Sequence, residues 1–308
     1  MNMDAFVFPG QGSQYSGMGK KLAENFNVAK LVFEEANDAL GFDLTTLCFS
    51  GSEDDLKLTA NTQPAILTTS IAALRVLQEE TDLLPSFVAG HSLGEYSALV
   101  ATGALTFAAA VITVRQRGTF MQEAVPVGAG AMAAIMGIKK EELLQLCQDV
   151  AAGEVVTPAN YNSPGQIVIA GHTSAVERAI VLAKERGAKR ALLLPVSAPF
   201  HSSLMAQAAQ RLQAELESIN VAPLTCPVVS NVEAVPYQEE AKVKTLLVEQ
   251  VCAPVRWDES IQKMKDLGVT RYIEIGPGRV LSSLIKRIDR SARQKNIDDV
   301  TSLEKLFT

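Results

Sequence analysis

Gly90-His91-Ser92-Leu93-Gly94 follows a short apolar run, Phe87–Ala89, and precedes a run with helical character, Glu95–Ala101. This G-x-S-x-G pattern between a strand and a helix is typical of a nucleophile elbow, in which a serine occupies a strained turn at the C-terminal edge of a sheet. Glycines are needed on both sides because a side chain there would collide with neighbouring backbone. We therefore predict that Ser92 is an acyl nucleophile and that the N–H of Leu93 binds the oxyanion. The alternative is a glycine-flanked strand end without chemistry.

The composition is that of a soluble globular protein. The chain has 308 residues, of which 47% are hydrophobic and 20% charged, and its formal net charge is −6. No apolar run reaches the roughly 18 residues that span a bilayer, and the N-terminus lacks the basic start of a signal peptide. We expect a cytoplasmic protein without membrane contact. The negative charge disfavours binding to nucleic acid.

The few cysteines and histidines disfavour a metal site. Four cysteines are scattered without a C-x-x-C pair, and none of the three histidines stands at metal-ligand spacing from another. We expect reduced thiols, no metal and no redox cofactor.

A glycine loop follows the first predicted strand, Ala5–Phe8. A dinucleotide-binding fingerprint would need a third glycine at Tyr15, and a phosphate-binding P-loop would need Ser or Thr at Lys21, so both nucleotide-binding interpretations fail. The N–H of Gln11 is a candidate second oxyanion donor if this strand lies beside the one that ends at Ala89. A plain tight turn is the alternative.

Helical periodicity predicts three further helices, at Leu22–Ala39, Ala65–Leu77 and Phe107–Glu123, with Pro64 in the first turn of the second. The third helix is almost wholly apolar until two arginines, one of which is Arg117. An arginine there either lies at a solvated helix end or binds a substrate carboxylate through the paired N–H donors of its planar guanidinium.

The segment from residue 126 to 197 has a different pattern from its flanks. Its predicted elements follow the order βαββαβ, which is typical of a split, ferredoxin-like unit. They are strand Ala131–Gly137, helix Lys139–Val150, strands Val155–Asn160 and Gln166–Ala170, a helix that begins with a capping box at Ser174 and Glu177 and ends at Gly187, and strand Ala191–Val196. We predict a small domain, residues 126–197, inserted in a larger α/β domain, residues 1–125 and 198–308.

His201 is the best candidate for the base that a catalytic serine needs. It lies between a predicted strand and a predicted helix, Ser203–Glu217, and so at a loop of the same kind as that of Ser92. His91 would point to the opposite face of its strand from Ser92, and His172 belongs to a turn of the insertion.

Seven motifs taken together resemble the malonyl-CoA:acyl carrier protein transacylase family. They run in order from about residue 6 to 280, and together they are far more specific than any one of them. The motifs are Phe8-Pro9-Gly10-Gln11-Gly12-Ser13-Gln14, Thr62-Gln63-Pro64-Ala65, Gly90-His91-Ser92-Leu93-Gly94-Glu95-Tyr96, Arg115-Gln116-Arg117-Gly118, Pro199-Phe200-His201-Ser202, Pro254-Val255-Arg256-Trp257 and Glu274-Ile275-Gly276-Pro277-Gly278.

This resemblance implies an α/β-hydrolase-like large domain with a ferredoxin-like insertion. It also implies Ser92 as the acyl nucleophile, His201 as the base, the N–H groups of Gln11 and Leu93 as the oxyanion hole, and Arg117 as the anchor of the malonyl carboxylate.

The base also needs an orienting partner, and no carboxylate precedes it in the order usual for hydrolases. The resemblance implies the carbonyl of Gln250 in that role, and Asp258 is the alternative from the sequence. It also associates Phe200 with selection of malonyl over methylmalonyl. Gln63 and Asn162 complete the substrate-binding residues that we assign.

The implied reaction is a ping-pong transfer of malonyl from malonyl-CoA, through Ser92, to the phosphopantetheine thiol of acyl carrier protein in fatty acid synthesis. We expect a monomer that needs no cofactor. A free-standing acyltransferase of a polyketide synthase and a serine thioesterase or hydrolase on the same fold are the alternatives, and a non-enzymatic scaffold is the least favoured.

A basic cluster near the end of the chain is either a solvated face or a docking site for the acidic carrier. It consists of Lys286, Arg287, Arg290, Arg293 and Lys295.

Overall fold

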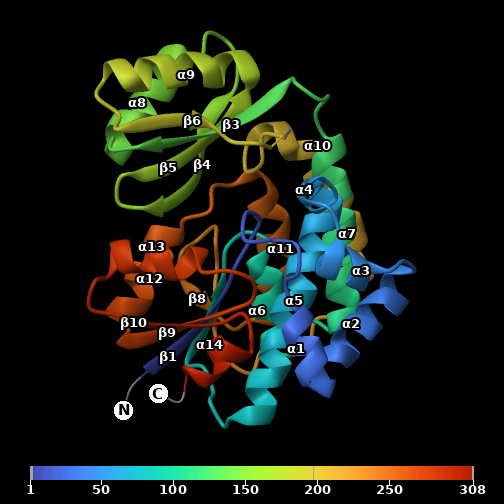
Figure 1. The fold of residues 1–308 in the computed structure, drawn as a ribbon. Helices are drawn as coiled ribbons and strands as arrows, with labels where there is room; N and C mark the ends of the chain where they lie inside the picture. Colours follow the sequence, from blue (N-terminus) through green and yellow to red (C-terminus); the bar gives the residue numbers. More distant parts are fainter. Residues whose placement is uncertain (1–2, 197, 307–308) are drawn as a thin grey trace.

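The computed structural model describes residues 3–196 and 198–306 as a mixed α/β fold with two sheets (Figure 1). The larger sheet has six strands in the order β10-β9-β1-β2-β7-β8, and all neighbouring pairs are parallel except β7 with β8. Its strands are β1 (Met3–Phe8), β2 (Phe87–Gly90), β7 (Val228–Val229), β8 (Pro236–Tyr237), β9 (Val269–Ile275) and β10 (Arg293–Ile297).

Strand β1 lies inside this sheet and is buried on both faces. Phe6 and Phe8 belong to the core on one face, whereas Ala5 and Val7 belong to the core on the other. Successive side chains of a strand point to opposite faces, so a continuous apolar run is what a central parallel strand requires. Strand β1 lies beside β2, with Phe8 paired to Gly90, which meets the condition set above for Gln11 as an oxyanion donor.

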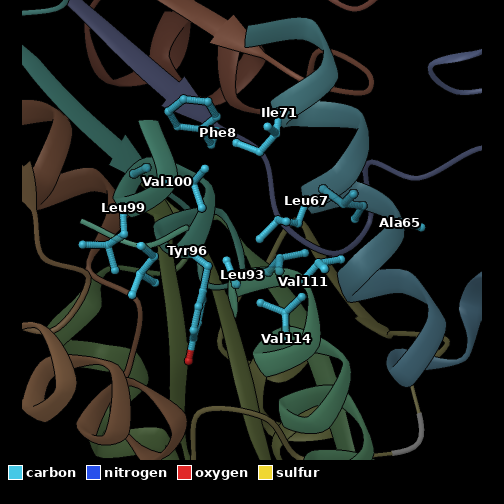
Figure 2. Close-up of a cluster of buried hydrophobic side chains, with 14 of the residues drawn as sticks. Phe8, Ala65, Leu67, Ile71, Leu93, Tyr96, Leu99, Val100, Val111 and Val114 are labelled. Carbon is cyan, nitrogen blue, oxygen red and sulfur yellow. The ribbon is translucent and has the colours of Figure 1, made fainter. Parts of the chain in front are cut away.

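Helices cover both faces of the large sheet. On one face lie α12 (Trp257–Asp266) and α13 (Val280–Ile288). The core of the other face includes residues of α1 (Lys20–Asn25), α2 (Asn27–Leu40), α3 (Leu44–Ser50), α4 (Glu53–Lys57), α5 (Thr59–Glu80), α6 (Gly94–Ala101), α7 (Phe107–Glu123), α10 (Ala206–Glu217), α11 (Glu240–Cys252) and α14 (Val300–Glu304). Figure 2 shows labelled side chains of α5, α6 and α7 gathered beside Phe8 of β1.

The second sheet belongs to a unit that the chain builds between α7 and the short 3-10 helix Ser203–Met205. Its order is β4-β5-β3-β6, with antiparallel neighbours throughout, and it has its own core. Its helices α8 and α9 lie on the side away from the large sheet (Figure 1). The elements are β3 (Gly130–Met136), α8 (Lys140–Val150), β4 (Val156–Ser163), β5 (Gln166–His172), α9 (Thr173–Glu185) and β6 (Arg190–Leu193).

Strand β4 joins this unit to the large one. Val255 donates its N–H to the carbonyl of Ala159 (2.9 Å) and accepts from the N–H of Tyr161 (2.8 Å). The division into two domains stays a prediction, and its predicted boundary at residue 197 and its chain ends at 1–2 and 307–308 lie outside the described residues.

Two helix predictions for the large unit are wrong. The helix expected over Leu22–Ala39 is two helices, because Phe26 has extended backbone (φ −127°, ψ 121°) between α1 and α2. Helix α5 begins at Thr59, so Pro64 lies inside it and not in its first turn. The first residues of α5 pack closely on α7, since a side chain at Gly118 would collide with the backbone of Thr59. This packing favours a helix that begins at Thr59 and not near Pro64.

The predicted capping box of α9 is also wrong. The helix begins at Thr173, and the hydroxyl of Ser174 donates to the carboxylate of Glu154 (2.7 Å) and not to the helix backbone. Glu154 also pairs with Arg178 (2.9 Å), so a contact between distant segments replaces the local cap.

In the described part of the chain, no helix combines the length and the apolarity needed to cross a bilayer. Over the same residues, no three His, Cys, Asp or Glu side chains gather as a metal site would require.

Candidate active site

Ser92 lies on a sharp turn between β2 and α6, at the end of a central parallel strand. Its φ of 51° is in the left-handed region, which costs a residue with a side chain on the order of 1–3 kcal/mol. A Cβ at Gly90 would overlap the backbone of Gly94, and a Cβ at Gly94 would overlap the carbonyl of Phe8. Both glycines of the motif are therefore required sterically, and the turn presents the hydroxyl to the cavity described below.

Asn231 holds this turn in place, and sequence reasoning missed it. It follows β7, the neighbour of β2. Its Oδ1 accepts from the N–H of Ser92 (2.7 Å), and its Nδ2 donates to the carbonyl of Gly90 (2.6 Å). Because the N–H of Ser92 is engaged, oxyanion donors must come from elsewhere. Leu93 and Gln11 line the same cavity as Ser92, where we predicted these donors.

His201 contacts Ser92 although 109 residues separate them. Its Nε2 lies 2.8 Å from Ser92 Oγ, and its Nδ1 lies 2.8 Å from the carbonyl oxygen of Gln250. A carbonyl can only accept, so Nδ1 carries the proton and Nε2 is free to accept one from the serine hydroxyl. Asp258 lies at the start of α12 and accepts from the N–H of Glu259 (2.8 Å), so it does not orient His201.

Burial lowers the pKa of His201 to about 3, and the positive charge of Arg117 contributes to that shift. The imidazole is therefore neutral between pH 5 and 8 and can act as a base. A depressed histidine pKa means that the folded state binds fewer protons than the unfolded state between about pH 3 and 6.5. The stability that depends on His201 is present above pH 6.5 and falls as the pH is lowered through this window.

A pH profile tests this environment of His201. We expect the rate constant for acylation by malonyl-CoA to stay flat from pH 7.5 to about pH 5, because a solvated histidine would titrate near 6.5 and a buried one does not. The rate should be measured by rapid quench, with near-ultraviolet circular dichroism as the control for folding at each pH. An acidic limb with a midpoint near 6.5 would contradict the buried, neutral base.

Arg117 lies inside α7 with only 1% of its side chain exposed, and not at a solvated helix end. Its Nη1 donates to Gln63 Oε1 (2.8 Å), and its Nη2 donates to Gln250 Oε1 (2.9 Å) and to Ser92 Oγ (3.1 Å). All three acceptors are neutral. Guanidinium stays charged in proteins, so the site holds a buried cation beside the serine, where a carboxylate would find a partner.

Ser92, His201 and Arg117 line a cavity of about 110 Å³ between the two sheets. The large unit contributes its polar side, and the second unit and the loop after it contribute much of the apolar wall. The lining residues are Gln11, Gln63, His91, Ser92, Leu93, Arg117, Met121, Met132, Asn160, Leu194, Val196, Phe200 and His201.

The predicted substrate contact of Asn162 stays a prediction: its Oδ1 lies 2.8 Å from Nε2 of His91, and Asn160 of the same strand lines the cavity. His91 lines the same cavity as Ser92 and not the opposite face, since both follow the last residue of β2, where strand alternation has ended. Gln250 holds Arg117 and His201 from behind without lining the cavity.

The fold and this geometry define a class of protein: an α/β protein with a serine and histidine in contact at the end of a parallel sheet, beside a buried arginine. The family model described as "Acyl transferase domain" matches residues 5–306. A malonyl CoA-acyl carrier protein transacylase of Bacillus subtilis (strain 168) is 52% identical over 305 residues, which are 99% of this chain and 96% of that protein. The corresponding transacylase of Salmonella typhimurium is 46% identical over the full length of both chains.

Solved structures agree with these relatives. An acyl carrier protein S-malonyltransferase from Vibrio cholerae superposes with a TM-score of 0.97 at 48% identity, covering 99% of this chain and 100% of that one. A malonyl-transacylase solved in complex with its type II PKS acyl-carrier protein gives a TM-score of 0.96 at 47% identity, with 99% and 98% covered. The chain belongs to the acyl transferase family, in its group of malonyl CoA-acyl carrier protein transacylases, as the motifs indicated.

Proposed function

We propose that this protein is an S-malonyltransferase that moves malonyl from malonyl-CoA to the phosphopantetheine thiol of acyl carrier protein. The relatives named above carry that activity in their names. The choice of substrate rests on one observation: the buried guanidinium of Arg117 lies 3.1 Å from the Ser92 hydroxyl. An acyl group with a free carboxylate is the substrate that such a cation favours.

In the first half-reaction Ser92 attacks the thioester of malonyl-CoA. The hydroxyl proton passes to Nε2 of His201, 2.8 Å away, as Oγ bonds to the carbonyl carbon. The N–H groups of Leu93 and Gln11 stabilise the oxyanion. The intermediate then collapses to the acyl-enzyme, and His201 returns the proton to the departing CoA sulfur.

In the second half-reaction the carrier thiol takes the place of CoA. His201 accepts the thiol proton, the sulfur attacks the malonyl ester, and the proton returns to Ser92 Oγ as the ester bond breaks. The carbonyl of Gln250 keeps His201 in the required tautomer throughout, although it stabilises imidazolium less than a carboxylate would. We propose Gln63 and Phe200 as the remaining substrate contacts from the predicted set, with Asn162 acting only through His91. This chemistry calls for no metal or cofactor.

We also propose the finer architecture. The antiparallel order β4-β5-β3-β6 with two helices on one face supports a ferredoxin-like insertion, and the parallel sheet that ends in the elbow supports an α/β-hydrolase-like large domain. The protein acts as a monomer in this proposal, since every proposed catalytic group comes from one chain.

The choice of pathway depends on the carrier. One solved relative is in complex with a type II PKS acyl-carrier protein, so transfer to a polyketide carrier is the second candidate. The deciding experiment incubates the protein with malonyl-CoA and weighs it intact, then adds holo carriers of both types. We expect a stable increase of one malonyl group that disappears when the right carrier is added. Loss of the label in buffer alone would indicate a thioesterase.

Charge reversal tests where the carrier docks. The structure splits the basic cluster, because Lys286 and Arg287 lie in the last turn of α13, beside the second unit, whereas Arg293 and Lys295 lie on the edge strand β10. Arg287 also donates to Gln166 of β5.

We expect Arg287→Glu with Arg290→Glu to raise the KM for the carrier on the order of 10-fold and to weaken its dependence on salt. Acylation by malonyl-CoA alone should not change. Lys20→Glu with Lys30→Glu, on α1 and α2, is the control with the same change in net charge. A carrier KM equal to that of the control would place docking elsewhere, for example at Lys189 and Arg190.

A further inference from the structure

The side-chain amide of Gln250 connects three groups around the nucleophile. Its Oε1 accepts from Arg117 Nη2 (2.9 Å). Its Nε2 donates to the carbonyl of Ser92 (3.0 Å) and to Oε2 of Glu95 (2.6 Å). An amide turned by 180° would face its NH₂ group to a guanidinium that can only donate, so its orientation decides whether Arg117 has an acceptor here.

Glu95 stands behind this amide and takes no part in the mechanism above. It lies in the first turn of α6 with 0% of its surface exposed. Its Oε2 also accepts from the N–H of Asn231 (3.3 Å), and its Oε1 has no partner in the described structure. Burial raises the pKa of Glu95 to about 8. A carboxyl group is costly at such a position, and a core residue of the same size would not carry that cost.

When the carboxyl group of Glu95 is ionised, or when its proton is on Oε1, its Oε2 can only accept a hydrogen bond from Gln250 and cannot donate one. The 2.6 Å contact therefore selects the amide orientation that turns Oε1 of Gln250 toward Arg117. The guanidinium is then held at both ends, by Gln63 on Nη1 and by Gln250 on Nη2.

We propose that Glu95 is a positioning residue that orients the amide of Gln250 and, through it, the guanidinium of Arg117 beside Ser92. This inference rests on the proposed function, in which the guanidinium of Arg117 binds the malonyl carboxylate. Glu95 itself touches no reacting atom.

Glu95→Met is the principal test, because methionine keeps the buried volume and removes the acceptor oxygen. We expect kcat/KM for malonyl-CoA to fall about 10-fold or more, since Arg117 loses a fixed position. The value for acetyl-CoA, which has no carboxylate to place, should change less than about threefold. Glu95→Gln can present an acceptor oxygen to Gln250 and should recover most of the malonyl activity.

Two controls separate positioning from a general loss of stability. Leu99→Ala removes buried volume from the same helix, so it should lower the Tm while the ratio of malonyl to acetyl kcat/KM stays unchanged. In an Arg117→Ala background, Glu95→Met should have almost no further effect on malonyl transfer, because both changes act through one guanidinium. Glu95→Ala replaces Glu95→Met in the same set if the methionine variant does not fold.

A crystal structure of the Glu95→Met protein is the readout that does not depend on activity. We expect the Gln250 amide or the Arg117 guanidinium to be displaced from the distances given above. The inference would be overturned if the Gln250 amide and the Arg117 guanidinium both kept their positions, or if kcat/KM fell equally for malonyl-CoA and acetyl-CoA. It would also be overturned if the effects of Glu95→Met and Arg117→Ala on malonyl transfer were additive, or if Glu95→Gln did not recover malonyl activity. If the wild-type protein takes acetyl-CoA as readily as malonyl-CoA, the proposed function fails, and the crystal structure still decides whether Glu95 positions Arg117.

Discussion

Ser92→Ala is expected to abolish the acyl-enzyme and to lower malonyl transfer by a factor on the order of 10⁴ or more. Ser92 Oγ is the group that His201 Nε2 and Arg117 Nη2 both contact, so its removal leaves the base and the cation without a nucleophile between them. The measurement is intact mass after incubation with malonyl-CoA, together with the steady-state rate of transfer to the carrier.

The fold should survive this substitution. Ser92 is on a turn whose shape depends on its backbone N–H and on the flanking glycines, none of which changes. Ser97→Ala is the control, because it deletes a buried hydroxyl from α6, the helix that follows the turn, without touching the site. Malonyl labelling of Ser92→Ala at the wild-type rate would assign the nucleophile to another residue.

Arg117→Ala is expected to lower kcat/KM for malonyl-CoA by about 30-fold or more, since losing the partner of a buried carboxylate costs on the order of 2–5 kcal/mol. Acetyl-CoA lacks that carboxylate, so its kcat/KM should fall little and can rise. The substitution therefore separates a malonyl-specific enzyme from a general serine acyltransferase.

The Tm of Arg117→Ala alone does not decide its role, because the change also leaves the buried oxygens of Gln63 and Gln250 without a donor. The ratio of malonyl to acetyl kcat/KM is the deciding quantity. Arg115→Ala is the matched control on the same helix, where the arginine contacts Asn61 and the ring of Phe42 and lies outside the cavity. Equal losses for both acyl groups would make Arg117 a structural residue and leave malonyl selection without a physical basis.

Local sequence patterns were sufficient for much of this fold. Steric exclusion around Gly90, the continuous apolar run of β1 and helical periodicity in α7 involve residues that are close in sequence, so they are visible in a linear chain. The same is true of the βαββαβ order of the second unit. The predictions failed where distant contacts outweighed local preference, as at Pro64 inside α5 and at Ser174 beside Glu154.

The proposed nucleophile and base could also be selected from the sequence, because one is carried by a local motif and the other is one of only three histidines. The hydrogen-bond network around Ser92 and His201 could not be predicted from the sequence. Asn231 braces Ser92 across 139 residues, and Gln250 reaches Glu95 across 155.

Such contacts depend on which strands are neighbours in the sheet and on where α6, α7 and α11 pack, and no spacing in the chain records this. For the same reason, no pattern in the sequence pointed to Asn160, which lines the cavity. Local sterics and periodicity determine the elements and the reactive turn, whereas tertiary packing decides which polar groups meet at Ser92.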